Sequence, residues 1–201
     1  MTRVLAVVAV GLMLGGVMAA DLNLWSLSPG WWGLAAMTVI ATAARQRWFG
    51  LALAAPGSPE RGLWIGLGSG AVLAGHMGLS LYRIGADMAM HSPQVHAFAI
   101  DSWVLVLGGV LAWAIARDPR PRRDERDAQI ATLGLRWSHY TLVGLIAAGL
   151  VPLGYGWTAS VAAMSHAMIA QLLIVALMVS WVVDSAVRLR EYRRDAIEAS
   201  E

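Results

Sequence analysis

Apolar residues in this chain fall into six long blocks separated by short polar segments. The blocks are continuous rather than alternating, which favours helices over strands. A helix needs about 20 residues to cross the hydrocarbon core of a bilayer, and in lipid it satisfies its own backbone hydrogen bonds. The pattern therefore predicts an all-α, polytopic membrane protein with a single domain over 1–201. The six predicted transmembrane helices cover about 4–20, 31–48, 62–83, 100–117, 135–155 and 158–184.

Two of these blocks leave alternatives open. The second has a short uninterrupted apolar part, Trp31–Ala44, and spans only if it borrows residues near Phe49 or meets a thin bilayer. The first, Met1–Ala20, also fits a secretory signal with one early arginine and small residues before Asp21. Cleavage there would leave five helices; we favour retention, since the chain starts at Met1.

Composition agrees with a membrane protein and narrows the chemistry. The chain has 201 residues, of which 58% are hydrophobic and 14% charged. It has no cysteine, which excludes disulfides and cysteine-ligated iron–sulfur clusters in this chain. A formal net charge of +2 is too small to support nucleic-acid binding.

The distribution of arginine predicts the orientation. All 15 basic residues are arginines. With both termini in the cytoplasm, every one of them except Arg83 falls on the cytoplasmic side, as the positive-inside rule requires. We therefore predict six helices with the N-terminus and the C-terminus inside.

Two histidines, His76 and His166, lie within membrane-length apolar blocks. A polar side chain in hydrocarbon is costly unless it is satisfied, so each is a candidate functional residue. A rise of 1.5 Å per residue places His76 roughly 8 Å and His166 roughly 12 Å below the outer ends of their predicted helices. The similar depth suggests one shared ligand, a haem iron held by both rings. The alternative is that each ring forms an ordinary hydrogen bond between helices.

Neighbouring residues would support such a site. A ligating imidazole usually donates its other N–H to an oxygen, and Ser80 would serve His76 while Ser165 or Thr158 would serve His166. Gly75 would relieve crowding against a porphyrin. The many small residues of the predicted helices favour close helix packing and would also leave room for a macrocycle.

The remaining polar residues carry weaker predictions. His91 and His96 flank a proline in an outer loop and form at most a weak metal pair. His139 has the position of a structural interfacial residue. Asp101 is predicted to cap the helix at 100–117. The charged segment 117–136 is predicted to be a solvated connector, with a docking surface as the alternative.

The sequence resembles the cytochrome b (gamma) subunit of membrane-bound nitrate reductases and related quinone-linked b-type cytochromes. The matching pieces are VLAGHMGLS at Val72–Ser80 and AAMSHAMIA at Ala162–Ala170, and the resemblance covers about 62–187. It implies a haem b ligated by His76 and His166 and a quinone beside Gly75, His76 and Arg83. It also implies other subunits of a redox complex as partners and the bacterial inner (cytoplasmic) membrane as the location.

One departure from that family limits the number of haems. The family typically carries a second haem toward the cytoplasm, and the positions that would hold its ligands are Gly66 and Asp184 here. Gly66 and Asp184 cannot form that second haem site. The resemblance therefore implies one haem b at most, on the outer side.

These observations favour a membrane electron-transfer subunit with one bis-histidine haem b, linked to quinone and part of a larger respiratory or photosynthetic complex. Such a chain would be the non-catalytic subunit of an oxidoreductase rather than a free-standing enzyme. A cofactor-free assembly subunit of a membrane complex and a copper-handling membrane protein remain as alternatives.

Overall fold

The computed structural model describes residues 2–20, 28–46, 59–86, 88, 92–117, 124–155 and 159–198. These residues form six long helices and one short one, without a strand, as the sequence predicted. The helices are α1 (Thr2–Ala19), α2 (Pro29–Arg45), α3 (Glu60–Ile84), α4 (Pro93–Ala116), α5 (Glu125–Tyr155), α6 (Ala159–Ala162) and α7 (His166–Glu198).

Five of the described helices, α1, α3, α4, α5 and α7, are long and apolar enough to cross a membrane. The chain is therefore a multi-pass membrane protein. The remaining long helix, α2, has 17 residues. The apolar residues near Phe49 that were predicted to lengthen it lie outside the described residues.

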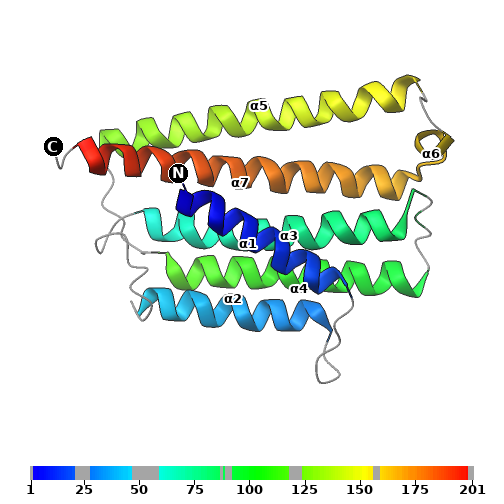
Figure 1. Ribbon diagram of the computed structural model, residues 1–201, viewed down its shortest axis with the longest axis horizontal. Helices are drawn as coiled ribbons and strands as arrows, with labels where there is room; N and C mark the ends of the chain where they lie inside the picture. Colours follow the sequence, from blue (N-terminus) through cyan, green and yellow to red (C-terminus); the bar gives the residue numbers. More distant parts are fainter. Residues whose placement is uncertain are drawn as a thin grey trace.

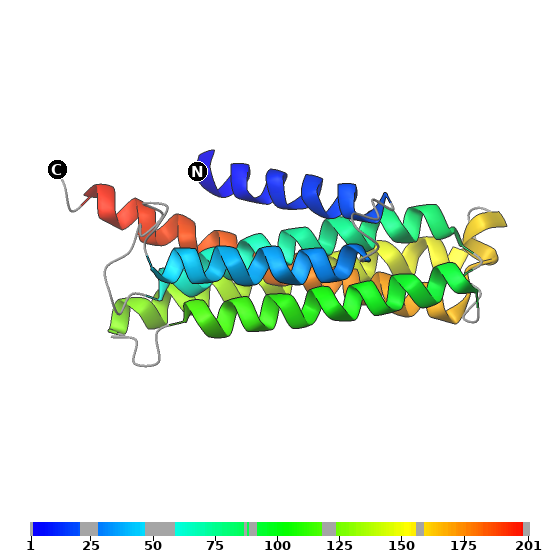
Figure 2. The ribbon, with the colours of Figure 1, turned by 90° about the horizontal axis from the view of Figure 1, so that it is seen from below.

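The long helices form a row in the order α5, α7, α3, α4 and α2, and α1 crosses obliquely over α3 (Figure 1). A view from the side shows α1 as a separate layer above this row (Figure 2). Within the described residues, α5 contacts only α7 and α6. One end of the bundle, which we call the arginine-rich end, carries Arg3, Arg45, Arg61, Arg117 and Arg188.

Close approach between helices depends on glycine. A Cβ atom at Gly15 of α1 would overlap the carbonyl oxygen of Val72 in α3, and one at Gly75 would overlap that of Leu12 in α1. In α5, a Cβ at Gly134 would lie 2.5 Å from the Cγ of Arg188 in α7. Small residues let helix backbones approach in lipid. The predicted packing role is confirmed at Gly108 of α4, where a Cβ would lie 2.8 Å from the Cα of Leu34 in α2. It is not found at Gly144 and Gly149 of α5, where a Cβ would meet no described atom within 4 Å.

Several helices begin before or end after their predicted bounds. The helix predicted at 100–117 begins at Pro93, where the Oγ of Ser92 accepts a hydrogen bond of 3.3 Å from the Val95 N–H. The helix predicted at 135–155 begins at Glu125. There the Asp124 and Asp127 side chains each accept a hydrogen bond from the other's backbone N–H, at 2.8 and 3.1 Å, like a capping box. The second half of the segment predicted as a connector at 117–136 is therefore helical.

The helix predicted at 158–184 is interrupted. α6 ends at Ala162, and α7 begins at His166 and continues to Glu198. Ser165 causes the new start, because its Oγ accepts a hydrogen bond of 3.2 Å from the Met168 N–H. Its own N–H donates to the Ala86 carbonyl oxygen at 3.2 Å. His166 is thus at the first residue of its helix, and the prediction that it lies about two turns inside is wrong.

Candidate functional site

His76 is the most buried titratable side chain in the membrane-spanning part of α3, with 2% of its surface exposed. Its ring stacks on that of Phe98 in α4, with centroids 6.2 Å apart and planes inclined by 20°. On another side, the backbone at His76 lies close to Gly15 of α1. The sequence prediction that His76 is buried in a membrane helix is therefore confirmed, and the ring is directed to α4.

A cavity of about 390 Å³ opens beside His76 at the end of the bundle opposite the arginine-rich end. Residues from three helices line this cavity. On α3 and α4, lining residues recur at intervals of three and four, so they share one face of each helix. The lining comprises Met18 and Ala19 of α1; His76, Ser80, Arg83 and Ile84 of α3; and Pro93, Gln94, Ala97, Phe98 and Asp101 of α4.

Arg83 lines the same cavity as His76. The binding role that the family resemblance implied for these two residues stays a prediction. Its Nη1 donates a hydrogen bond to the carbonyl oxygen of Ala19, the last residue of α1. A cation is favourable at that position because helix C-termini carry unsatisfied carbonyl groups and partial negative charge. Arg83 therefore joins α1 to α3 and also supplies a positive charge to the cavity.

Asp101 is a buried carboxylate at the deep side of the same cavity, with 7% exposure. Its Oδ1 accepts hydrogen bonds from the Ser28 hydroxyl at 2.6 Å and from the Gly30 N–H at 3.1 Å. Both donors belong to the start of α2. The prediction that Asp101 caps its own helix is wrong: Ser92 caps α4, and Asp101 caps the neighbouring α2.

The other predicted site residues lie elsewhere. Gly75 packs against the Leu12 backbone of α1 and does not line the cavity. His166 is exposed at the start of α7. Ser165, predicted as its partner, is occupied by the α7 cap and by a hydrogen bond of 3.4 Å to the Met88 carbonyl oxygen. Thr158 lies outside the described residues.

The relative level of the two histidines follows from the antiparallel contact of α3 with α7. A Cβ at Gly66 would face Trp181 and Ser185, and one at Gly70 would face Val182. Continuing this register places His76 opposite about residue 175 of α7. That level is roughly nine residues from His166, so the two histidines differ in height along the helices by about 14 Å at 1.5 Å per residue. The two rings share neither a cavity nor a level, so the described residues do not fit one haem held by both.

The remaining histidines do not complete a metal site in the part of the chain that the structure describes. His96 is exposed on the first turn of α4, and His139 is exposed on α5. His91, the other half of the predicted loop pair, lies outside the described residues. Within those residues, no group of three histidine, aspartate or glutamate side chains is placed to hold a metal ion.

Phe98 and Gln94 are site residues that sequence reasoning missed. The signal was present, because Gln94, Phe98 and Asp101 recur at helical spacing. It was hidden because the helix was predicted to begin only at residue 100.

Comparison with protein-family models, with curated proteins and with solved structures gives no match for this chain.

Proposed function

We propose that this protein is a membrane subunit of a redox complex and binds the headgroup of a quinone in the cavity beside His76. The observation that supports this most strongly is the composition of the cavity wall. A buried imidazole, a guanidinium group, a hydroxyl and an amide from His76, Arg83, Ser80 and Gln94 share it with the ring of Phe98.

A quinone headgroup matches this wall chemically. It is a flat apolar ring with carbonyl oxygens that accept hydrogen bonds, and its isoprenoid tail dissolves in lipid. Arg83, Ser80 and Gln94 are hydrogen-bond donors, and Phe98 offers an aromatic face. The imidazole of His76 has nitrogens that can donate or accept a hydrogen bond, which suits a carrier that gains or loses protons with its electrons.

The orientation belongs to the same proposal. Arginine is concentrated at one end of the bundle, where α1 begins and α7 ends. The positive-inside rule places that end in the cytoplasm, with both termini inside. The cavity then lies in the outer leaflet of a bacterial inner membrane.

The source of electrons is a further part of the proposal. Because the described residues do not fit a bis-histidine haem, this chain would position the quinone, and a redox centre on a partner subunit would exchange electrons with it. This retains the quinone part of the sequence prediction and assigns the chain a non-catalytic role within an oxidoreductase.

Photoaffinity labelling tests the location of the site. The purified full-length protein is illuminated with an azido-substituted quinone, and the modified peptides are identified by mass spectrometry. We expect adducts within α3 at residues 76–84 and within α4 at 94–101, and we expect excess unmodified quinone to remove them. Adducts that resist competition, or that map only to other helices, would contradict the proposal.

A further inference from the structure

A second cavity, of about 470 Å³, lies between α1 and α2 and has α3 as its floor. Its lining is apolar along most of its length and includes Val7, Val10 and Leu14 of α1, Ile40 of α2 and Val72 of α3. The two walls touch at the end away from the arginines, where a Cβ at Gly33 of α2 would lie 3.1 Å from the Cε of Met18. We call this cavity the α1–α2 groove.

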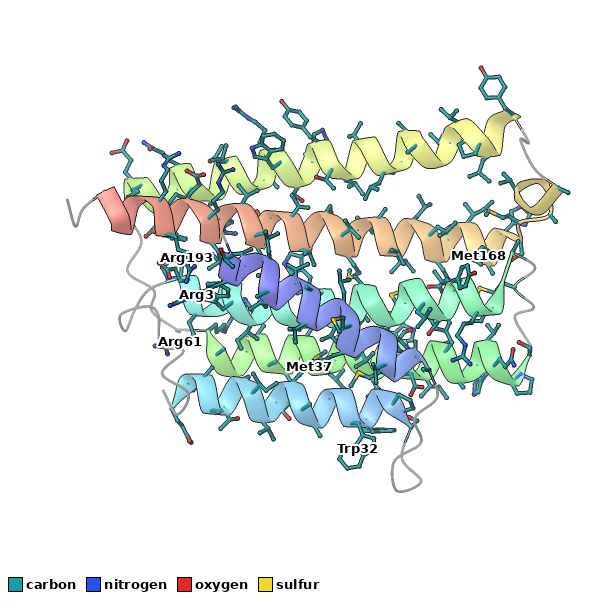
Figure 3. All side chains as sticks on the ribbon, viewed as in Figure 1. Arg3, Trp32, Met37, Arg61, Met168 and Arg193 are labelled. Atoms are coloured by element: carbon teal, nitrogen blue, oxygen red, sulfur yellow. The ribbon has the colours of Figure 1, made fainter. Side chains whose placement is uncertain are left out.

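Two arginines, Arg3 and Arg61, line the groove at its arginine-rich end (Figure 3). Arg3 is the second residue of α1 and is exposed, whereas Arg61 is the second residue of α3 and is half-buried. Neither forms an ion pair with an acidic group among the described residues. Other arginines at this end do have partners: Arg188 pairs with Asp184 at 3.2 Å, and Arg194 pairs with Glu191 at 3.0 Å.

The neighbouring charges leave the groove positive at its mouth. Arg193 lies over the ring of Trp64, with its Cζ 5.3 Å from the ring centroid. An acidic residue beside this cluster, Glu60, lies within electrostatic reach of Arg193, Arg126 and Asp127. Ser69 lines the groove, and its hydroxyl donates to the Ile65 carbonyl oxygen at 2.8 Å. The groove therefore combines an apolar body with two cations at one end that have no ion-pair partner among the described residues.

We infer that the α1–α2 groove binds one anionic glycerophospholipid from the leaflet on the arginine-rich side. The phosphate group contacts Arg3 and Arg61, because a guanidinium group binds phosphate oxygens through paired hydrogen bonds. One acyl chain lies along Val7, Val10 and Ile40. The two arginines complement the charge of an anionic headgroup at the depth of the headgroups, where basic pockets between membrane helices recognise anionic lipid.

Native mass spectrometry of the full-length protein, released from detergent, tests this inference. The probes are palmitoyl-oleoyl phosphatidylglycerol and palmitoyl-oleoyl phosphatidylcholine, which share their acyl chains and differ in headgroup charge. We expect one phosphatidylglycerol to be retained in preference to phosphatidylcholine. Near a membrane surface each arginine contributes roughly 5-fold to the binding of anionic lipid. The variant with both Arg3→Gln and Arg61→Gln should therefore bind phosphatidylglycerol about 30-fold more weakly.

Two further variants make the result decisive. Arg136→Gln removes the same charge from an exposed position on α5, outside the groove, and should leave binding unchanged. Val10→Trp fills the groove at an exposed position of α1 and should prevent retention although both arginines remain. Equal retention of the two lipids, or an equal loss in Arg136→Gln, would overturn the inference and indicate general attraction to the basic end.

Discussion

At the scale of single residues, Asp101 and His166 show where sequence reasoning succeeds and where it stops. The sequence identified Asp101 as a cap but not the helix that it caps, because α2 reaches it only through tertiary packing. His166 was placed inside an apolar block, yet Ser165 caps a new helix that begins at His166, and the His166 ring is exposed. His76 and Arg83 were brought to one cavity as predicted, because both lie on the same face of one helix.

The two hydrogen bonds of Asp101 give a prediction for stability. Asp101→Ala should lower the free energy of unfolding by about 2–3 kcal/mol, since it leaves the Gly30 N–H and the Ser28 hydroxyl without a buried acceptor. Ser92→Ala removes the cap of α4 and should cost about 1 kcal/mol. Thermal unfolding in detergent compares the two variants. An Asp101→Ala effect of about 1 kcal/mol or less, no larger than that of a single cap, would show that the bridge between α4 and α2 contributes little to stability.

At the scale of helices, five of the six apolar blocks correspond to helices long and apolar enough to cross a membrane, and a crossing by α2 stays a prediction. The blocks did not predict where the helices end. The length of an apolar block reflects the thickness of the hydrocarbon core and not the full length of the helix. A helix continues past that core where polar residues cap it or form ion pairs, as Asp124 with Asp127 and Arg188 with Asp184 do here. The sequence predicted that the helices pack closely, but not which helices form pairs. Its glycines indicated close packing. That Gly15 packs against α3 and Gly33 against α4 is evident only from the structure.

Two adjacent glycines of α1 test the packing against α3. Gly15→Ala should destabilise the protein by about 1–3 kcal/mol, because the new Cβ overlaps the backbone carbonyl of Val72 and the helices must separate. Gly16→Ala is the matched control, since its Cβ would meet only the Leu79 side chain at 3.7 Å, an ordinary contact. The midpoints of thermal unfolding should fall for the first variant and stay unchanged for the second. Equal midpoints would mean that α1 does not pack as described.

At the scale of the whole molecule, the bundle separates two environments. The arginine-rich end holds Arg3 and Arg61 beside an apolar groove, and neither has an ion-pair partner in the part of the chain that the structure describes. The opposite end holds the polar cavity around His76. The sequence predicted this polarity through its arginine distribution and its buried histidine. It could not predict that His76 faces α4 rather than α7, because an apolar helix with small residues on several faces gives no signal for its rotation.

The quinone content of the purified protein tests the central claim most directly. His76→Phe keeps a ring against Phe98 but removes both nitrogens, and His139→Phe makes the same change at an exposed position of α5. Quinone extracted per mole of protein should fall at least about 10-fold in His76→Phe, the effect of losing roughly 1.4 kcal/mol of hydrogen bonding, and should stay at the wild-type level in His139→Phe. Wild-type protein that retains no quinone, or equal retention by both variants, would contradict the assignment of the His76 cavity.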